Sequence, residues 1–478
     1  MTPISDELGR SPLIKYFTYH RSWCKAPWLI SSFVFVRTEN LFQMAFRSAS
    51  FFSFLVLISF SVSVLIFSME YLEKVTRSRG HGGLFGSDFI WQEKRTSSRH
   101  VFTSASQTKT AYKGSLGILN VVKKTPQAET PIPIIYKNSF NKLPLWDFED
   151  VYNQDAPPRL TTCAQSLRNS KDEAFQKAFL PNISLFLHKD SINMSEWNRL
   201  SHFNNPFGFM EYKYDDVMAS LKLIPKPKEP LLSPKPESEG CVRCAVVGNG
   251  GILNGSKMGA EIDAHDYVFR MNAAVIKGYE EDVGNRTSVY VHTAHSITAS
   301  LRFFQKYGYT AAPHDQNIKY VMIPEGMRDF QWLEGLLKGE QVSCGKNCSR
   351  DPRTYYSGQY NESRFYVLHQ DFLRYVRNRF LPSKTLNDSF WTIFRPTNGA
   401  FTLFLALHTC DTVSAYGFMT EDYSEYPNYY VERETKTEVV FFINHDYILE
   451  KDLWKSLHER KIIKLYQRSH EGKEKRKK

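Results

Sequence analysis

The amino-acid sequence predicts an α/β domain with a largely parallel sheet flanked by helices over residues 150–478, preceded by a transmembrane helix and a flexible stem. Three observations predict this layout. Residues 48–69 carry no formal charge, a polar segment without sustained periodicity follows them, and short apolar runs then alternate with helix-like stretches. Of the 478 residues, 42% are hydrophobic, enough for a sizeable core, which excludes a wholly disordered or fibrous chain.

The formal net charge of +11 would ordinarily suggest a nucleic acid or an anionic membrane as partner. The excess charge lies at the two ends of the chain. Residues 1–47 carry +3, residues 70–150 carry +4 and residues 451–478 carry +7, which leaves −3 for residues 151–450. Because the middle of the chain offers no basic face for a phosphate backbone, the sequence predicts no nucleic-acid partner.

The uncharged stretch from Ser48 to Met69 has 22 residues, and a helix needs about 20 apolar residues to cross the hydrocarbon core of a bilayer. A buried core helix is the alternative, but such helices average about 11–12 residues and usually show one polar face. We therefore expect a transmembrane signal-anchor at 48–69 and a cytoplasmic tail at 1–47. A translation start at Met44 would also leave a sufficient tail.

Glycosylation sequons and cysteines indicate which side of the membrane the rest of the chain occupies. All seven Asn-X-Ser/Thr sequons and six of the seven cysteines follow the span. Both features are typical of an oxidising, secretory compartment, so we expect a single-pass type II protein with its C-terminal part in the lumen. The sequons are Asn182, Asn193, Asn254, Asn285, Asn347, Asn361 and Asn387.

The stem is expected to cover residues 70–149, which are rich in Ser, Thr, Lys, Gln and Gly and show no helical or strand period. A short helix is predicted over 171–180, where alanine and phenylalanine recur at helical spacing. Five prolines between Pro225 and Pro236 then predict an extended connection, since each proline fixes φ and lacks a backbone donor.

Apolar runs beyond this connection predict the sheet, and strands that alternate with helices favour parallel pairing. A last apolar run, 441–446, is interpreted as a strand that delivers His445 at its carboxyl end. The other predicted strands are 244–248, 267–271, 288–291, 318–323 and 412–416, and the predicted helices between them are 300–307, 329–337 and 397–408.

Two glycine-containing turns are candidates for binding a phosphate. The Gly248–Gly251 turn follows a strand, where glycines let a phosphate approach the backbone, but Leu253 breaks the dinucleotide pattern G-x-G-x-x-G. The Arg395–Gly399 turn opens a helix, whose backbone N–H groups and dipole suit an anion, with the Thr397 hydroxyl as a further donor. A tight turn without ligand and a plain helix cap are the respective alternatives.

His445 follows the last apolar run and is a candidate general base, because imidazole titrates near neutral pH. The alternative is a structural histidine. The residues singled out so far lie in separate parts of the chain, and each of them taken alone is a weak signal.

Taken together, these segments resemble the eukaryotic sialyltransferases. The stretch 244–287 is similar to the long sialyl motif of that family, 395–418 to the short motif, Tyr429-Tyr430 to the third motif, and His445 with Glu450 to the very short motif. The motifs occur in the family's order, and the resemblance covers roughly residues 150–470. Within it, residues 248–279 are most similar to the α-N-acetylgalactosaminide α-2,6-sialyltransferases.

The resemblance implies a variant GT-A (Rossmann-like) fold and an inverting transfer of sialic acid from CMP-sialic acid. The implied product is an α-2,6 linkage to GalNAc on Ser or Thr of glycoproteins, made in the Golgi without a metal or other cofactor. It further implies that His445 is the general base and that Glu450 orients it or supports the structure. The implied donor-binding residues are Asn249, Asn272, Thr293, Thr397, Asn398, Gly399, Tyr429 and Asn444.

At three positions the sequence departs from the family pattern. Asn398 stands where Ser or Thr is usual, Tyr429 where related proteins often have His, and Thr293 where some have Asn. These departures affect the expected donor contacts and leave His445 unchanged.

The resemblance also implies a disulfide between Cys244 and Cys410, which joins the long and short motifs. Cys163 with Cys241 is the expected second pair, and Cys344 with Cys348 a candidate third. Zinc held by Cys241, Cys244 and the 344/348 pair is the alternative, which an oxidising compartment disfavours.

Two other functions remain open from the sequence. One is a sialyltransferase with a different acceptor, such as a galactose-terminated glycan or a ganglioside. The other is a catalytically silent, lectin-like relative, against which the retained His445 counts. The sequence also leaves open whether the acceptor GalNAc is bare or galactosylated, because acceptor pockets depend on loop shape.

Overall fold

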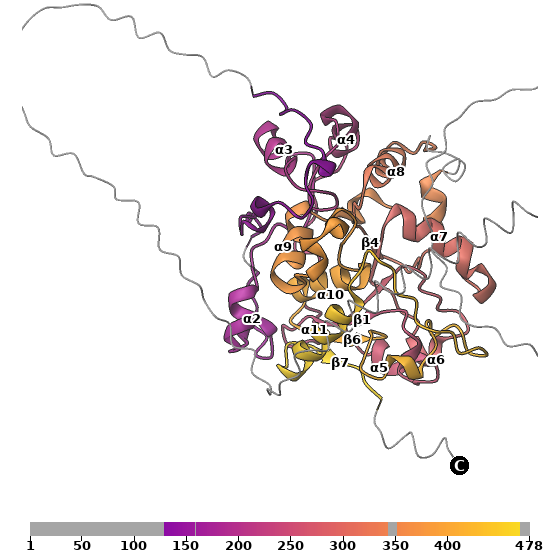
Figure 1. Cartoon of the computed structure of the whole chain (residues 1–478). Coiled ribbons are helices and arrows are strands. Elements are labelled where there is room, and N and C mark those ends of the chain that lie inside the picture. The colour runs from indigo at the N-terminus through magenta and orange to yellow at the C-terminus, as the bar shows by residue number, and fades with distance from the viewer. Residues whose placement is uncertain (1–128, 158, 343–350, 469–478) are drawn as a thin grey trace, which may run out of the picture. The chain divides into compact units, whose positions relative to one another are not determined.

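A computed structural model describes residues 129–157, 159–342 and 351–468 (Figure 1). Its centre is a sheet of seven strands in the order β5-β4-β3-β2-β1-β6-β7, in which every neighbouring pair is parallel. The α/β class with a parallel sheet is thus confirmed. The strands are β1 (Arg243–Val247), β2 (Tyr267–Met271), β3 (Val289–His292), β4 (Lys319–Met322), β5 (Phe365–Val367), β6 (Thr412–Tyr416) and β7 (Lys464–Leu465).

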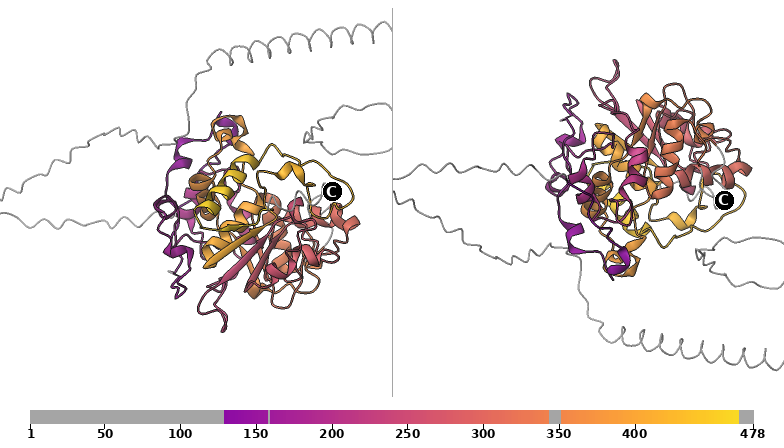
Figure 2. Two further views of the ribbon diagram at one scale, coloured as in Figure 1. Left: turned by 90° about the horizontal axis from the view of Figure 1, so that it is seen from below. Right: turned by 90° about the horizontal axis from the view of Figure 1, so that it is seen from above.

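Helices lie on both sides of this sheet (Figure 2). The helices of the described residues are α2 (Glu173–Ala178), α3 (Met194–Leu200), α4 (Tyr214–Leu221), α5 (Gly259–Asp263), α6 (Glu280–Val283), α7 (Ala294–Phe304), α8 (Met327–Lys338), α9 (Gln370–Phe380), α10 (Asn398–Thr409) and α11 (Tyr447–Glu459).

Strand β1 shows how the sheet divides the core. Cys244 and Val246 point into the larger hydrophobic cluster with α10, whereas Ala245 and Val247 point into a second cluster with α5. This alternation follows from the two-residue period of a strand, and a strand buried on both faces must be apolar throughout. Helix α10 is itself buried from Ala400 to Thr409, so it crosses the centre of the domain.

Most predicted elements are found within a few residues of their expected bounds, and β2 and β6 match them fully. Helix α7 begins six residues earlier than predicted, because the Thr293 and Ser296 side chains form a capping box at its amino end. The predicted strand at 441–446 is wrong. This run has no strand partner, and its turn is closed by a hydrogen bond from the His445 N–H to the Phe442 carbonyl oxygen.

The structure contains the disulfides Cys163–Cys241 and Cys244–Cys410. The second bridge joins β1 to the residue that follows α10. Cys344 and Cys348 lie outside the described residues.

The anchor predicted at 48–69 also falls outside the part of the chain that the structure describes. Within that part, no helix is long and apolar enough to cross a membrane. The last residues assigned to the stem pack against the domain: Leu143 is buried, and its N–H donates to the Leu386 carbonyl oxygen at 3.0 Å.

Candidate active site

The candidate site lies at the carboxyl ends of the strands, where the turns after β1 and β6 contact each other through their backbones. The Gly250 N–H donates to the Gly417 carbonyl oxygen at 3.0 Å. A Cβ atom on Gly250 would lie 2.6 Å from that oxygen, and one on Gly251 would lie 1.8 Å from the Pro427 carbonyl oxygen. Glycine is therefore required here by close packing of backbones.

We expect Gly251→Ala to destabilise the domain by about 1–3 kcal/mol, because the Pro427 backbone must move to make room for the new methyl group. Thermal unfolding measures this change. The matched control is Gly326→Ala, where a Cβ atom would have its nearest neighbour at 3.6 Å. Because Gly326 is the amino cap of α8, we expect a change of at most about 1 kcal/mol. Equal melting temperatures for the two variants would contradict the contact described.

Three asparagines predicted to bind the donor are joined in this region. The Asn398 side-chain amide donates to the Asn272 side-chain oxygen at 2.8 Å, and the Asn249 amide donates to the Met271 carbonyl oxygen at 3.2 Å. All three side chains are half-buried, and they come from the end of β1, the end of β2 and the start of α10. The structure thus brings the long-motif and short-motif residues together.

The third motif, Tyr429-Tyr430, lies against the turn that follows β1. Gly250 and Tyr429 form an antiparallel bridge, and the Tyr430 N–H donates to the Asn249 carbonyl oxygen at 3.2 Å. The Tyr429 ring meets the Phe304 ring edge-on, with 5.0 Å between centroids. Tyr429 therefore lies beside the glycine turn that follows β1.

Thr293 is placed differently. It lies directly after β3 but is buried, and its hydroxyl oxygen accepts a hydrogen bond from the Ser296 N–H at 2.8 Å. In this structure, Thr293 caps α7.

The amino end of α10 is held by Glu450, which is buried in α11. The two carboxylate oxygens of Glu450 accept from the Thr397 N–H at 2.7 Å and from the Thr397 hydroxyl at 2.6 Å. These bonds agree with the orienting or structural role implied for Glu450. The backbone N–H groups of Asn398 and Gly399, in the first turn of the helix, are in a position suited to an anion.

Burial raises the pKa of Glu450 to about 7 from an ordinary value of 4.5. A carboxyl with a raised folded-state pKa contributes its full stability below pH 4.5, and that contribution is lost as the pH rises through 7. Glu450→Gln imitates the protonated acid and does not titrate. We therefore expect the free energy of unfolding to fall between pH 5 and pH 8 by up to about 3 kcal/mol more in the wild type than in Glu450→Gln.

Denaturant unfolding at the two pH values measures that difference. Glu438→Gln, a change at an exposed glutamate, is the control and should behave as the wild type does. A fall in Glu450→Gln that equals or exceeds that of the wild type would contradict the assignment.

His445 is held in one tautomer. Its Nδ1 lies 2.8 Å from the Arg395 carbonyl oxygen, which can only accept, so Nδ1 carries the proton and Nε2 carries the lone pair. The Asn444 side-chain amide lies 3.2 Å from Nε2. Burial, with the nearby Arg395 guanidinium, lowers the pKa of His445 to about 4, so the ring is neutral at physiological pH and able to accept a proton.

The segment around His445 is fixed to the turn before α10. The Arg395 N–H donates to the Asn444 carbonyl oxygen at 3.0 Å, and the Arg395 guanidinium makes a two-pronged ion pair with Glu325, at 2.8 and 3.1 Å. Asp446 caps α11 and accepts from the Ser383 hydroxyl at 2.7 Å. His445 and the amino end of α10 therefore form one unit.

Two carboxyl groups in this region, those of Glu325 and Asp329, were not predicted as site residues from the sequence. Glu325 follows β4, and Asp329 accepts from the Ala294 and Gly326 N–H groups at 2.8 and 3.0 Å. Burial, with the nearby Glu325, raises the pKa of Asp329 to about 7. The signal that could have found Glu325 is its place directly after a predicted strand, at the same edge of the sheet as the other candidates.

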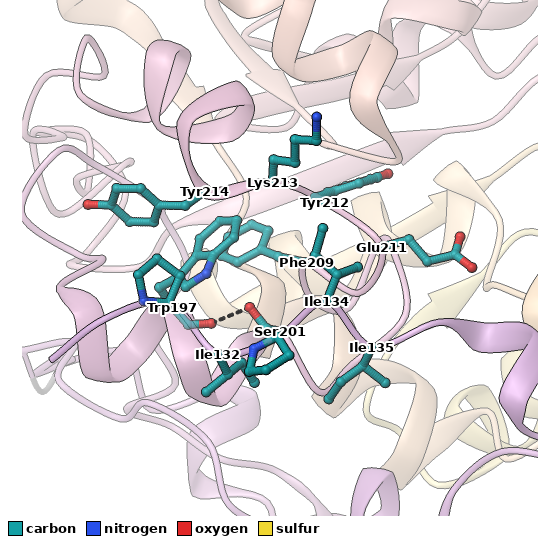
Figure 3. A pocket seen from close by; sticks show the side chains of 12 residues that line it. Ile132, Ile134, Ile135, Trp197, Ser201, Phe209, Glu211, Tyr212, Lys213 and Tyr214 are labelled. Carbon is teal, nitrogen blue, oxygen red and sulfur yellow. Dashed lines mark hydrogen bonds between the residues drawn. The ribbon is translucent and has the colours of Figure 1, made fainter.

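A cavity of about 200 Å³ lies elsewhere, between the segment 131–135 and the region of α3 and α4 (Figure 3). Aromatic rings, prolines and isoleucines make up most of its lining, with Trp197 stacked on Phe209 at 4.8 Å between ring centroids. None of the candidate site residues lines this cavity, so the hydrogen-bonded cluster at the sheet edge remains the candidate active site. Within the described ranges, no group of three or more His, Cys, Asp or Glu side chains could hold a metal ion.

A parallel α/β sheet with a neutral histidine fixed beside a helix amino end is an arrangement suited to group transfer from an anionic donor. The family model of glycosyltransferase family 29 (sialyltransferase) matches residues 186–462. The match covers more than half of the chain. The chain therefore belongs to this family. The resemblance found in the sequence is confirmed.

The chain is similar to several curated relatives. It is 46% identical to alpha-N-acetylgalactosaminide alpha-2,6-sialyltransferase 1 of Gallus gallus, over 69% of this chain and 59% of the relative. It is 44% identical to the protein of the same name from Homo sapiens, over 77% of this chain and 65% of the relative. It is 39% identical to alpha-N-acetylgalactosaminide alpha-2,6-sialyltransferase 2 of Mus musculus, over 72% of this chain and 92% of the relative.

The chain therefore spans less than two thirds of the length of the first two relatives. Among solved structures, a crystal structure of a mammalian sialyltransferase matches with a TM-score of 0.47 and 21% identity. That match covers 65% of this chain and all of the other.

Proposed function

We propose that this protein transfers sialic acid from CMP-sialic acid, in α-2,6 linkage, to GalNAc that is O-linked to Ser or Thr of glycoproteins. Membership of glycosyltransferase family 29 and the names of the similar relatives support the reaction and the acceptor. The observation that carries the proposal is His445, whose Nδ1–H is fixed on the Arg395 carbonyl oxygen so that the lone pair lies on Nε2. The Asn444 amide donates to this lone pair at 3.2 Å, and the acceptor hydroxyl takes the place of that bond in the proposed reaction.

In the proposed step, Nε2 of His445 takes the proton from the 6-hydroxyl of GalNAc. The hydroxyl oxygen forms a bond to the anomeric carbon of sialic acid, on the face opposite the phosphate. The bond from that carbon to the phosphate oxygen breaks, and CMP leaves with the electron pair, so the configuration inverts. Positioning and a prepared anion site at the amino end of α10 supply the stabilisation, and the proposed reaction requires no metal or other cofactor.

The proposed donor site is formed by the residues gathered at the sheet edge. Asn249 and Asn272 contact the CMP part, while Asn398 and Gly399 at the start of α10 hold the phosphate or ribose. Tyr429 and Asn444 complete the site. Thr397 and Thr293 support the site as helix caps, because their hydroxyl oxygens accept from backbone N–H groups in the first turns of α10 and α7.

The proposed location is the Golgi membrane, with the anchor at 48–69, a cytoplasmic tail at 1–47, a stem at 70–149 and a lumenal catalytic domain. The two disulfides support an oxidising compartment. Four of the six sequon asparagines within the described ranges are exposed, namely Asn193, Asn285, Asn361 and Asn387, and the exposure of these side chains supports a glycosylated, lumenal surface.

The test compares acceptors for the full-length protein supplied with CMP-sialic acid. The panel holds a GalNAc-peptide, the same peptide with galactosylated GalNAc, a galactose-terminated glycan and a ganglioside. Transfer to the first or second acceptor supports the proposal. Transfer only to the galactose-terminated glycan or the ganglioside would favour the other acceptor class, and transfer to none would favour a silent, lectin-like relative.

A further inference from the structure

A run of exposed apolar side chains stands directly before His445. Val440, Phe441, Phe442 and Ile443 are 49%, 48%, 54% and 63% exposed. Single exposed hydrophobic residues are ordinary, but several large ones gathered in one place often mark an interaction site. The sequence predicts an apolar strand at 441–446, so the exposure of Phe441, Phe442 and Ile443 is a finding of the structure.

Backbone hydrogen bonds hold this run in place beside His445. The His445 N–H donates to the Phe442 carbonyl oxygen at 3.1 Å, and the Arg395 N–H donates to the Asn444 carbonyl oxygen at 3.0 Å. The Tyr447 ring meets the rings of His445 and Phe441, with 5.6 and 5.4 Å between centroids. The apolar surface is therefore continuous with the candidate base.

More exposed apolar side chains lie on the neighbouring segments. Ile393 precedes Arg395, whose backbone is bonded to Asn444, and Ile448 stands in the first turn of α11. These side chains carry no charge. We name the whole set the rim patch, and it consists of Ile393, Val440, Phe441, Phe442, Ile443 and Ile448.

The position of the rim patch restricts what covers it during the reaction. The hydroxyl that gives its proton to Nε2 belongs to a sugar, and when that sugar is O-linked, its peptide carrier begins one sugar ring away. The carrier must then cross the surface that borders His445. A sugar is recognised through hydrogen bonds, whereas an apolar rim suits prolines and apolar side chains of a peptide.

We propose that the rim patch binds the polypeptide of the acceptor glycoprotein, an uncharged apolar or proline-containing stretch that flanks the glycosylated Ser or Thr. This inference rests on the proposed function and adds a peptide subsite to it. The patch provides affinity for the carrier, while His445 and the donor site perform the chemistry.

The double variant Phe442→Ser/Ile443→Ser in the full-length protein tests the inference with two acceptors, a GalNAc-peptide and methyl α-GalNAc. We expect KM for the GalNAc-peptide to rise about tenfold, because two exposed apolar contacts with the carrier are lost. We expect kcat, KM for CMP-sialic acid and KM for methyl α-GalNAc to stay within about twofold of the wild type. The reason is that neither the donor nor methyl α-GalNAc, which has no peptide, extends to the rim patch.

The matched control is Leu160→Ser, which removes an apolar side chain that is 92% exposed. The neighbouring residue Arg159 binds Asp411 at the amino end of β6, whereas the candidate site lies at the carboxyl ends of the strands. The Leu160→Ser variant should therefore use both acceptors as the wild type does. An equal loss with both acceptors, or none with the GalNAc-peptide, would overturn the inference. The inference would also be overturned if the double variant kept the wild-type KM for the GalNAc-peptide but bound phosphatidylcholine vesicles more weakly than the wild type. That result would assign the patch to a membrane. A wild type that uses neither acceptor refutes the proposed function instead.

Discussion

Replacing His445 by alanine should lower kcat by about 10²–10⁴-fold, while the melting temperature stays close to that of the wild type. The size follows from the usual contribution of a positioned general base. The fold should persist because the ring is half-buried and its one firm bond goes to the Arg395 carbonyl oxygen, which water can satisfy in the variant. Transfer from CMP-sialic acid to a GalNAc-peptide under saturating donor measures the effect.

His314→Ala is the matched control. His314 is an exposed histidine on the loop before β4, at the amino edge of the sheet, and its loss should leave kcat unchanged. If His445→Ala kept a third or more of the wild-type kcat, His445 would not be the base. Loss of activity together with loss of the folded state would point to a structural histidine, the alternative considered from the sequence.

Removing the Cys244–Cys410 bridge by a double alanine substitution should destabilise the domain by about 2–5 kcal/mol. The bridge joins residues 166 apart in the sequence, both are buried, and it connects β1 with the end of α10. Since the candidate site is built on the turn after β1 and the start of α10, activity should be lost at a lower temperature than in the wild type. Denaturant unfolding and thermal inactivation measure the two effects.

The disulfide pairing has its own check. Peptide mapping without reduction should recover the peptides containing Cys244 and Cys410 as one species from the wild type. A free thiol at either position, or an unchanged unfolding midpoint in the double variant, would contradict this part of the account.

The central strands could be predicted because β1 to β4 are buried on both faces and largely apolar, and β6 places Val413 and Ala415 at alternate buried positions. Strands β5 and β7 have three and two residues, too few to show a period, and their place in the sheet depends on neighbours distant in sequence. The strand predicted at 441–446 is wrong for a related reason. Composition alone does not tell a buried strand from an exposed loop, because the difference lies in whether a partner strand is present.

The residues of the candidate site could be named from the sequence because they lie in motifs of the family. The contacts among them are tertiary and could not be derived from spacing. Arg395 pairs with Glu325, 70 positions away, and Thr397 gives its N–H and hydroxyl to Glu450. The long-range ion pair and the buried carboxylate explain how His445 and α10 are fixed together, and neither has a local signal.

The most direct test of the central claim is the structure of the product. The full-length protein, CMP-sialic acid and a peptide with one GalNAc on threonine are incubated, and the product is analysed by mass spectrometry and NMR. The account predicts that one sialic acid is added, α-linked to the 6-oxygen of GalNAc, and that CMP is released in equal amount. Absence of any sialylated peptide, or sialic acid attached at another oxygen, would contradict it.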